Sequence, residues 1–176
     1  MQKPTYIIFL NLHVLYNSDK TLSTFPITSS DILRCGGDIN ISMLNQCYDN
    51  TIVLAKRFDQ TAVNNLEFFI EKLSEKYEVK IIITSCWKNR KNVNELKMLL
   101  SSYNFSEKIV DKSPESTNIL YEIKMCILKN QPLSDFIIFD CKNVELNYFG
   151  KKYFSVDSKK LLTFENIDQI LKNLEM

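Results

Sequence analysis

Three apolar runs in this chain of 176 residues end in polar side chains that could do chemistry. Asn11 and His13 follow the first run, Thr84 and Ser85 follow the second, and Asp140 ends the third. An imidazole or a carboxylate exchanges protons, and carboxylate oxygens hold hard cations such as Mg²⁺. Ligands of open parallel sheets bind beyond the carboxyl ends of the strands. The pattern therefore predicts Asn11, His13, Ser85 and Asp140 in one shared crevice.

Three of these residues, Thr84, Ser85 and His13, have alternative interpretations. Thr84 and Ser85 could bind an anion together with Lys88, or they could cap a helix that begins near Lys88, which is a common role for Ser and Thr. Capping requires nothing else from the sequence and is the preferred interpretation. His13 could be a partly buried imidazole that bonds to neighbouring backbone or to Asp140 rather than a reacting group.

The sequence around these residues alternates between predicted strands and predicted helices. Continuous apolar runs, as in strands that are covered on both faces, occur at residues 6–10, 79–83 and 136–139, with shorter candidates at 108–110 and 153–156. Apolar stripes at three-and-four spacing predict helices over 63–73, 93–103, 119–127 and 164–174. This alternation predicts an α/β fold, a three-layer Rossmann-like domain with a central parallel sheet.

Residues 17–60 do not follow that alternation. The stretch is rich in Ser, Thr, Asn and Asp, and it contains Gly36 and Gly37. A long excursion inside a compact domain is usually functional or carries small elements of its own. We expect one domain, 1–176, with 17–60 as a cap-like insertion, and we expect a protein partner to bind through this insertion.

Composition excludes several classes of function. The net charge of +1 does not favour a dedicated nucleic-acid binder. The three glycines make no phosphate-cradling loop, and the single histidine excludes an HExxH zinc site. The five cysteines form no CxxC pair, which predicts reduced thiols and a cytoplasmic, reducing compartment. No signal peptide or membrane segment is expected, because the first apolar run is too short.

Four segments, in order, resemble the haloacid dehalogenase (HAD) superfamily. Positions 9–17 (FLNLHVLYN) resemble the signature Phe-Leu-Asp-x-Asp-Gly-Val-Leu-Asn, and 81–88 (IIITSCWK) resemble the second motif in a branch linked to RNA-repair proteins. Positions 136–141 (FIIFDC) are similar to the fourth motif, and 161–167 (LLTFENI) to a Gly-Leu-Thr helix start. The resemblance implies a HAD strand order with residues 6–10 in the central strand, and it places 17–60 where HAD proteins insert a cap.

The departures from this family pattern fall on its catalytic residues. Asn11 occupies the position of the nucleophilic Asp, and a neutral carboxamide is a poor nucleophile and a weak Mg²⁺ ligand. His13 replaces the acid/base Asp, and Val14 replaces the following Gly. In the fourth motif Asp140 remains, whereas Cys141 stands where the family has a second acid.

The third motif departs as well. The Lys or Arg expected just before Glu122 is absent from residues 118–121, and Lys112 and Lys124 lie off position. We therefore expect no Mg²⁺ and no other cofactor, with Asp140 as the single residual metal ligand.

Three hypotheses for function follow. The first is a catalytically inactive HAD-like pseudoenzyme, a regulator or adaptor that acts by binding a protein or a ligand. The second is a divergent metal-dependent phosphoesterase or nucleic-acid-end processing phosphatase, with His13 as nucleophile or base and Asp140 holding Mg²⁺. The third is a sensor that binds a nucleotide or another anion without turnover.

Overall fold

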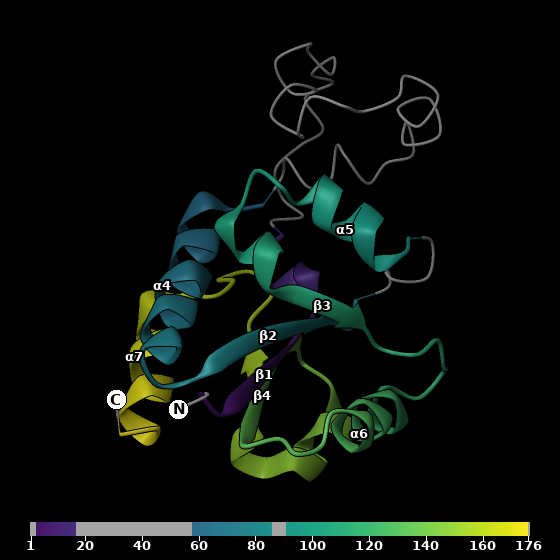
Figure 1. The fold of residues 1–176 in the computed structure, drawn as a ribbon. Coiled ribbons are helices and arrows are strands. Elements are labelled where there is room, and N and C mark those ends of the chain that lie inside the picture. Colours follow the sequence, from purple (N-terminus) through teal and green to yellow (C-terminus); the bar gives the residue numbers. More distant parts are fainter. Residues whose placement is uncertain (1–2, 17–57, 86–90, 176) are drawn as a thin grey trace, which may run out of the picture.

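The computed structural model describes residues 3–16, 58–85 and 91–175 (Figure 1). These residues form an α/β domain around one five-stranded sheet. The strands are β1 (Thr5–Leu10), β2 (Glu78–Ile83), β3 (Ile109–Lys112), β4 (Asp135–Cys141) and β5 (Tyr153–Val156). The helices are α4 (Gln60–Lys76), α5 (Val93–Leu99), α6 (Ile119–Lys129) and α7 (Phe164–Asn173), with the 3-10 segments η1 (Leu12–Leu15), η3 (Asn104–Lys108) and η4 (Val144–Lys152).

All strand pairs in the sheet are parallel, and the strand order is β3-β2-β1-β4-β5. The first strand is central, as the sequence predicts. Leu10 is in register with Ile83 on one side and with Phe139 on the other. Three strands therefore end at nearly the same level, and the residues that follow them share one edge.

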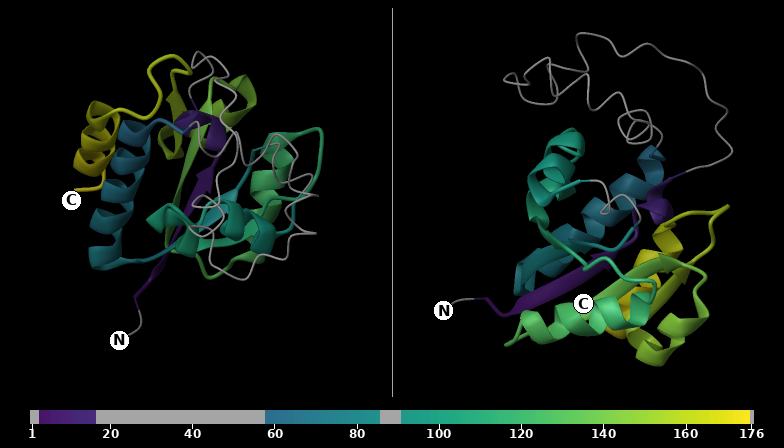
Figure 2. Two further views of the ribbon diagram at one scale, coloured as in Figure 1. Left: turned by 90° about the horizontal axis from the view of Figure 1, so that it is seen from above. Right: turned by 90° about the vertical axis from the view of Figure 1, so that its right-hand side faces the viewer.

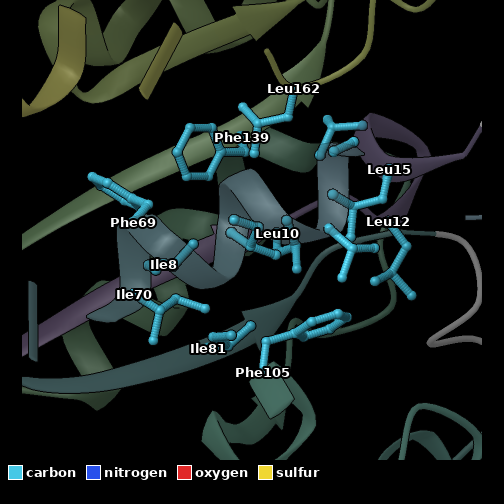
Figure 3. Close-up of a cluster of buried hydrophobic side chains, with 14 of the residues drawn as sticks. Ile8, Leu10, Leu12, Leu15, Phe69, Ile70, Ile81, Phe105, Phe139 and Leu162 are labelled. Carbon is cyan, nitrogen blue, oxygen red and sulfur yellow. The ribbon is translucent and has the colours of Figure 1, made fainter. Parts of the chain in front are cut away.

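Helices cover both faces of the sheet (Figure 2), and an apolar layer lies under the helices on each face. Ile8 and Phe139 point to one face and pack with Phe69 of α4, in a core that also includes side chains of α5 and α7 (Figure 3). Phe9 and Ile138 point to the other face, which α6 and η4 cover. Successive residues of a strand face opposite layers, and both layers exclude water. This explains why the strand sequences are apolar at every position and not at every second one.

One predicted helix is too long. The stripe over 93–103 predicts a helix to Tyr103, but α5 ends at Leu99, and Leu100 leaves the helical region with φ −99° and ψ 6°. Ser101 and Ser102 follow, and serine competes for backbone hydrogen bonds and so favours turns over helix interiors. Within the described ranges, no helix has both the length and the apolar character needed to cross a bilayer.

The two described ends of the excursion lie side by side. Tyr16 pairs with Phe58 in an antiparallel bridge, and the Asp59 N–H donates to the Leu15 carbonyl at 2.8 Å. Residues 16 and 58 therefore meet directly beside η1. Of the predicted cap and partner surface, 17–60, residues 17–57 lie outside the described ranges. The last residue of the predicted segment, Gln60, already belongs to α4.

Candidate functional site

Backbone hydrogen bonds continue the sheet past the ends of the central strands. The Asn11 N–H donates to the Phe139 carbonyl at 2.9 Å, and the Thr84 N–H donates to the Leu10 carbonyl at 3.0 Å. The segments that follow β1, β2 and β4 consequently leave the sheet as close neighbours. This arrangement brings residues that are more than 50 positions apart in sequence to one edge.

The orientation of the Asn11 carboxamide follows from its partners. Its Oδ1 atom accepts a hydrogen bond from the His13 backbone N–H at 3.1 Å. A backbone N–H can only donate, so the oxygen must face it and the amide nitrogen must face the other way. That nitrogen donates to Asp140 Oδ1 at 2.7 Å. Asn11 thus presents an N–H group, not an oxygen, to the carboxylate of Asp140.

The same logic determines the tautomer of His13. Its Nδ1 atom lies 2.9 Å from Asn11 Oδ1, which can only accept, so Nδ1 carries the proton. The Nε2 atom of the neutral ring then keeps its lone pair. Burial lowers the pKa of His13, which favours this neutral form. The His13 ring is therefore bonded to the Asn11 side chain, where the sequence suggested backbone or Asp140, and no described residue bonds to its Nε2 atom.

Asp140 is a buried carboxylate whose pKa is raised. Burial is the main cause and brings its pKa to about 6, against the lowering effects of the Asn11 amide and the Cys141 backbone N–H. The ordinary value is 3.8. The unfolded chain consequently releases this proton at lower pH than the folded chain, and the charged carboxylate penalises folding above about pH 6.

Replacing Asp140 with Asn should stabilise the fold at neutral pH. The expected gain is about 2 kcal/mol above about pH 6 and should vanish as pH falls towards 4, because the folded carboxyl is then protonated. Burial lowers the pKa of His13, which penalises folding at acid pH. This contribution to stability is the same in both proteins and cancels in the difference between them. Urea denaturation at several pH values measures the effect, and an Asp140→Asn variant that is less stable than the unmodified protein at every pH would contradict it.

Two buried hydroxyls at the end of β2 have no hydrogen-bond partner among the described residues: Thr84 Oγ1 and Ser85 Oγ. Neither caps a described helix, because the N-cap of α5 is Asn92, which makes a capping box with Glu95. The preferred capping interpretation thus finds no support in the described residues. Buried polar atoms are almost always bonded in native structures, so an unbonded pair indicates a place for a ligand or an ordered water.

A matched pair of serines tests this observation. Ser85 and Ser113 are each 1% exposed, but the Ser113 hydroxyl donates to Glu122 Oε2 at 2.8 Å. Without ligand, Ser85→Ala should leave stability unchanged or raise it by about 1 kcal/mol, whereas Ser113→Ala should cost about 1–3 kcal/mol. Chemical denaturation of both variants provides the comparison. Equal losses would show that the Ser85 hydroxyl does have a partner.

A pocket of about 350 Å³ opens beside this edge and is lined by Asn11, His13, Tyr16, Cys141 and Ser158. Burial and the nearby Asp140 raise the pKa of the Cys141 thiol, so it stays protonated at neutral pH. None of the five lining residues is an acid, a lysine or an arginine. Sequence reasoning missed Ser158 as a site residue, although it follows β5 and the rule used for the other strands would have found it.

The structure joins three of the four predicted site residues through direct hydrogen bonds, in the chain His13–Asn11–Asp140. Ser85 lies at the same edge of the sheet, but within the described ranges no hydrogen bond joins its hydroxyl to them. Lys88 lies outside the described residues.

The two off-position lysines make other contacts. Lys124 lies over the Tyr148 ring at 3.8 Å, and Lys112 is 3.7 Å from Glu115. Neither of these two contacts involves a residue of the site. Neither Lys112 nor Lys124 is therefore seen to supply the positive charge that the third motif would place there.

The donor set does not fit Mg²⁺. This cation requires several oxygen ligands in near-octahedral geometry, and carboxylates usually supply the charge. Among the described residues of the site Asp140 is the one carboxylate, and an amide N–H group already occupies its Oδ1 atom. In the part of the chain that the structure describes, no three His, Cys, Asp or Glu side chains gather as a metal site.

Comparison of this chain with protein-family models, with curated proteins and with solved structures found no match.

Proposed function

We propose that this chain is a catalytically inactive HAD-like module, a pseudophosphatase that acts by binding as a regulator or adaptor. The observation that carries the proposal is the Asn11 carboxamide, whose N–H group is directed at the site's carboxylate. A HAD phosphatase needs an anionic oxygen at this position to attack phosphorus. The carboxamide has no such charge, and its oxygen already accepts from His13.

The geometry at the end of the chain supports the HAD resemblance. Leu161 stands where the family has glycine, and its φ is 57°, in the left-handed region that glycine adopts without strain. Two residues later Thr163 caps α7, with a capping box formed by Asn166. A backbone conformation suited to glycine, followed by a capped helix, is what the Gly-Leu-Thr pattern implies.

The unbonded hydroxyls support binding of a ligand at the same edge. Thr84 and Ser85 are 6% and 1% exposed, and leaving two hydroxyls unsatisfied costs stability unless something binds them. His13 Nε2 adds an acceptor beside the pocket, whose five lining residues include no acid, lysine or arginine. We infer a small ligand that is held by hydrogen bonds without a covalent intermediate.

Phosphate release from an aryl phosphate tests the proposal. The unmodified protein should release no phosphate above the rate of the buffer, with Mg²⁺, Mn²⁺ or no added metal. The same assay on His13→Ala separates the alternatives. Release that is robust in the unmodified protein and disappears in His13→Ala would overturn the proposal.

One observation favours the second candidate function, a divergent phosphoesterase. The pKa of Asp140 is about 6, and perturbed carboxyl groups are common where acid/base chemistry occurs. Asp140 and His13 are also linked through Asn11. Among the described residues no three metal-binding side chains gather around Asp140 to hold the metal that this alternative requires, and for that reason we place it second.

A further inference from the structure

The sheet has two edge strands, β3 and β5, and they differ in how open they are to a further strand. The register of β3 against β2 shifts between Ile81 and Ile82, and its Asp111 pairs with Lys129 at 2.7 Å. Irregular pairing and charged side chains on an edge strand discourage another chain from adding to it. β5 keeps a regular register with β4 over all four of its residues. A further strand would therefore add more readily to β5.

The register identifies the backbone groups of β5 that face away from the sheet. Successive residues of a strand direct their N–H and C=O groups to opposite sides. The Phe139 carbonyl accepts from the Asn11 N–H, so Phe139 faces β1 and the next residue, Asp140, faces β5. Asp140 is in register with Ser155, and in a parallel pair such a residue bonds to the residues before and after its partner. The N–H and C=O groups of Ser155 therefore point outward, and Ser155 is exposed.

Two exposed side chains of opposite charge flank β5. Lys151 lies two positions before the strand, and Asp157 follows it directly. Among the described residues neither forms an ion pair, whereas the adjacent Lys152 pairs with Asp135. The Asp157 carboxylate accepts one hydrogen bond, from the Lys159 backbone N–H at 2.8 Å, and this bond does not neutralise its charge. A strand with a cation before it and an anion after it is complementary to an antiparallel copy of itself.

Symmetry limits the registers in which two copies of β5 can pair. Identical antiparallel strands in one continuous sheet are related by a two-fold axis perpendicular to the sheet, so residues opposite each other face the same side. Opposite positions must then be an even number of residues apart along the chain. The register centred on Phe154 sets Lys151 opposite Asp157 of the other copy. The register centred on Ser155 would set Lys151 opposite Lys159, which is repulsive.

We propose that a second copy of this chain pairs along β5 in the register centred on Phe154, which joins the two five-stranded sheets edge to edge. The Ser155 N–H of each copy then meets the Tyr153 carbonyl of the other, which also faces outward. The two partly exposed Phe154 rings lie beside each other across the two-fold axis. Each Lys151 ammonium meets an Asp157 carboxylate. This interface goes beyond the proposed function and uses no residue that lines the pocket.

A second copy suits this edge better than an unrelated strand does. Lysines beside an edge strand usually prevent pairing, because the approaching chain leaves their charge unpaired. The copy supplies an acid at the opposing position, and the two-fold symmetry produces this match twice. Four-residue strands bury little surface, so the dimer should be weak and should exchange with the monomer.

Sedimentation equilibrium of the full chain, up to a concentration on the order of 100 μM, tests the proposal. The average mass should rise with concentration from monomer towards dimer. Asp157→Lys and Lys151→Asp should each weaken dimerisation about tenfold or more, because each change replaces two ion pairs with two like-charge contacts. An equimolar mixture of the two variants should dimerise again, because their heterodimer regains both ion pairs. The double variant Lys151→Asp/Asp157→Lys should dimerise by itself for the same reason.

Glu107→Lys is the matched control, because it makes the same change of charge at an exposed position of η3, which precedes the opposite edge strand. It should dimerise as the unmodified protein does. A protein that stays monomeric throughout the concentration range would overturn the proposal. So would a dimer that Asp157→Lys leaves intact, a similar loss in Glu107→Lys, or a mixture of the two single variants that fails to dimerise.

Discussion

Replacing Asn11 with Asp should destabilise the fold by about 3 kcal/mol near pH 8, although the two side chains have nearly the same size. The substitution exchanges a donor for a second carboxylate opposite Asp140, across a contact that is now 2.7 Å long. No cation among the described residues is seen to neutralise the pair. The loss should shrink at acid pH, because the two carboxyl groups then share a proton.

The exchanged variant Asn11→Asp/Asp140→Asn is the control for this result. It keeps one carboxylate and one carboxamide at the same two positions, so it should recover most of the lost stability. Urea denaturation near pH 8 and near pH 5 measures all three proteins. The explanation fails if Asn11→Asp is neutral near pH 8, or if the exchanged variant is as unstable as the single one.

Phe69→Ala should cost about 3–5 kcal/mol, because it leaves a cavity between α4 and the sheet. The Phe69 ring is fully buried and meets the Phe139 ring edge-on, with the centroids 5.5 Å apart. Phe164→Ala is the matched control, because that ring is 54% exposed, and it should cost less than about 1 kcal/mol. Chemical denaturation compares the two, and similar losses would mean that the core is not where the structure places it.

The fold was predictable because the three inner strands, β2, β1 and β4, are largely buried on both faces. Ile7 and Ile8 point to opposite layers and are both fully buried, so the run reads as continuously apolar. The central place of β1 came from the family resemblance, since apolar runs alone do not give strand order. The end of α5 was missed because Tyr103 continues the apolar spacing after the backbone has already turned.

The site was predictable in position but not in its contacts. The rule that residues after parallel strands share an edge located Asn11, His13 and Asp140. The hydrogen bond between Asn11 and Asp140 joins residues 129 positions apart, and its donor direction depends on the His13 backbone N–H. The sequence likewise could not show that the Ser85 hydroxyl has no hydrogen-bond partner among the described residues, because this depends on where α5 begins.

Calorimetric titration of the unmodified protein with MgCl₂ tests the central claim most directly. We predict no saturable heat at millimolar concentration, because Asp140 is the one carboxylate that the described residues place at the site and Asn11 presents an N–H group to it. The variant Asn11→Asp/His13→Asp, checked for folding by circular dichroism, should bind Mg²⁺ more tightly because it restores two carboxylates. Clear saturation of the unmodified protein, which His13→Ala or Asp140→Asn abolishes, would contradict the claim that this site has lost its metal-dependent chemistry.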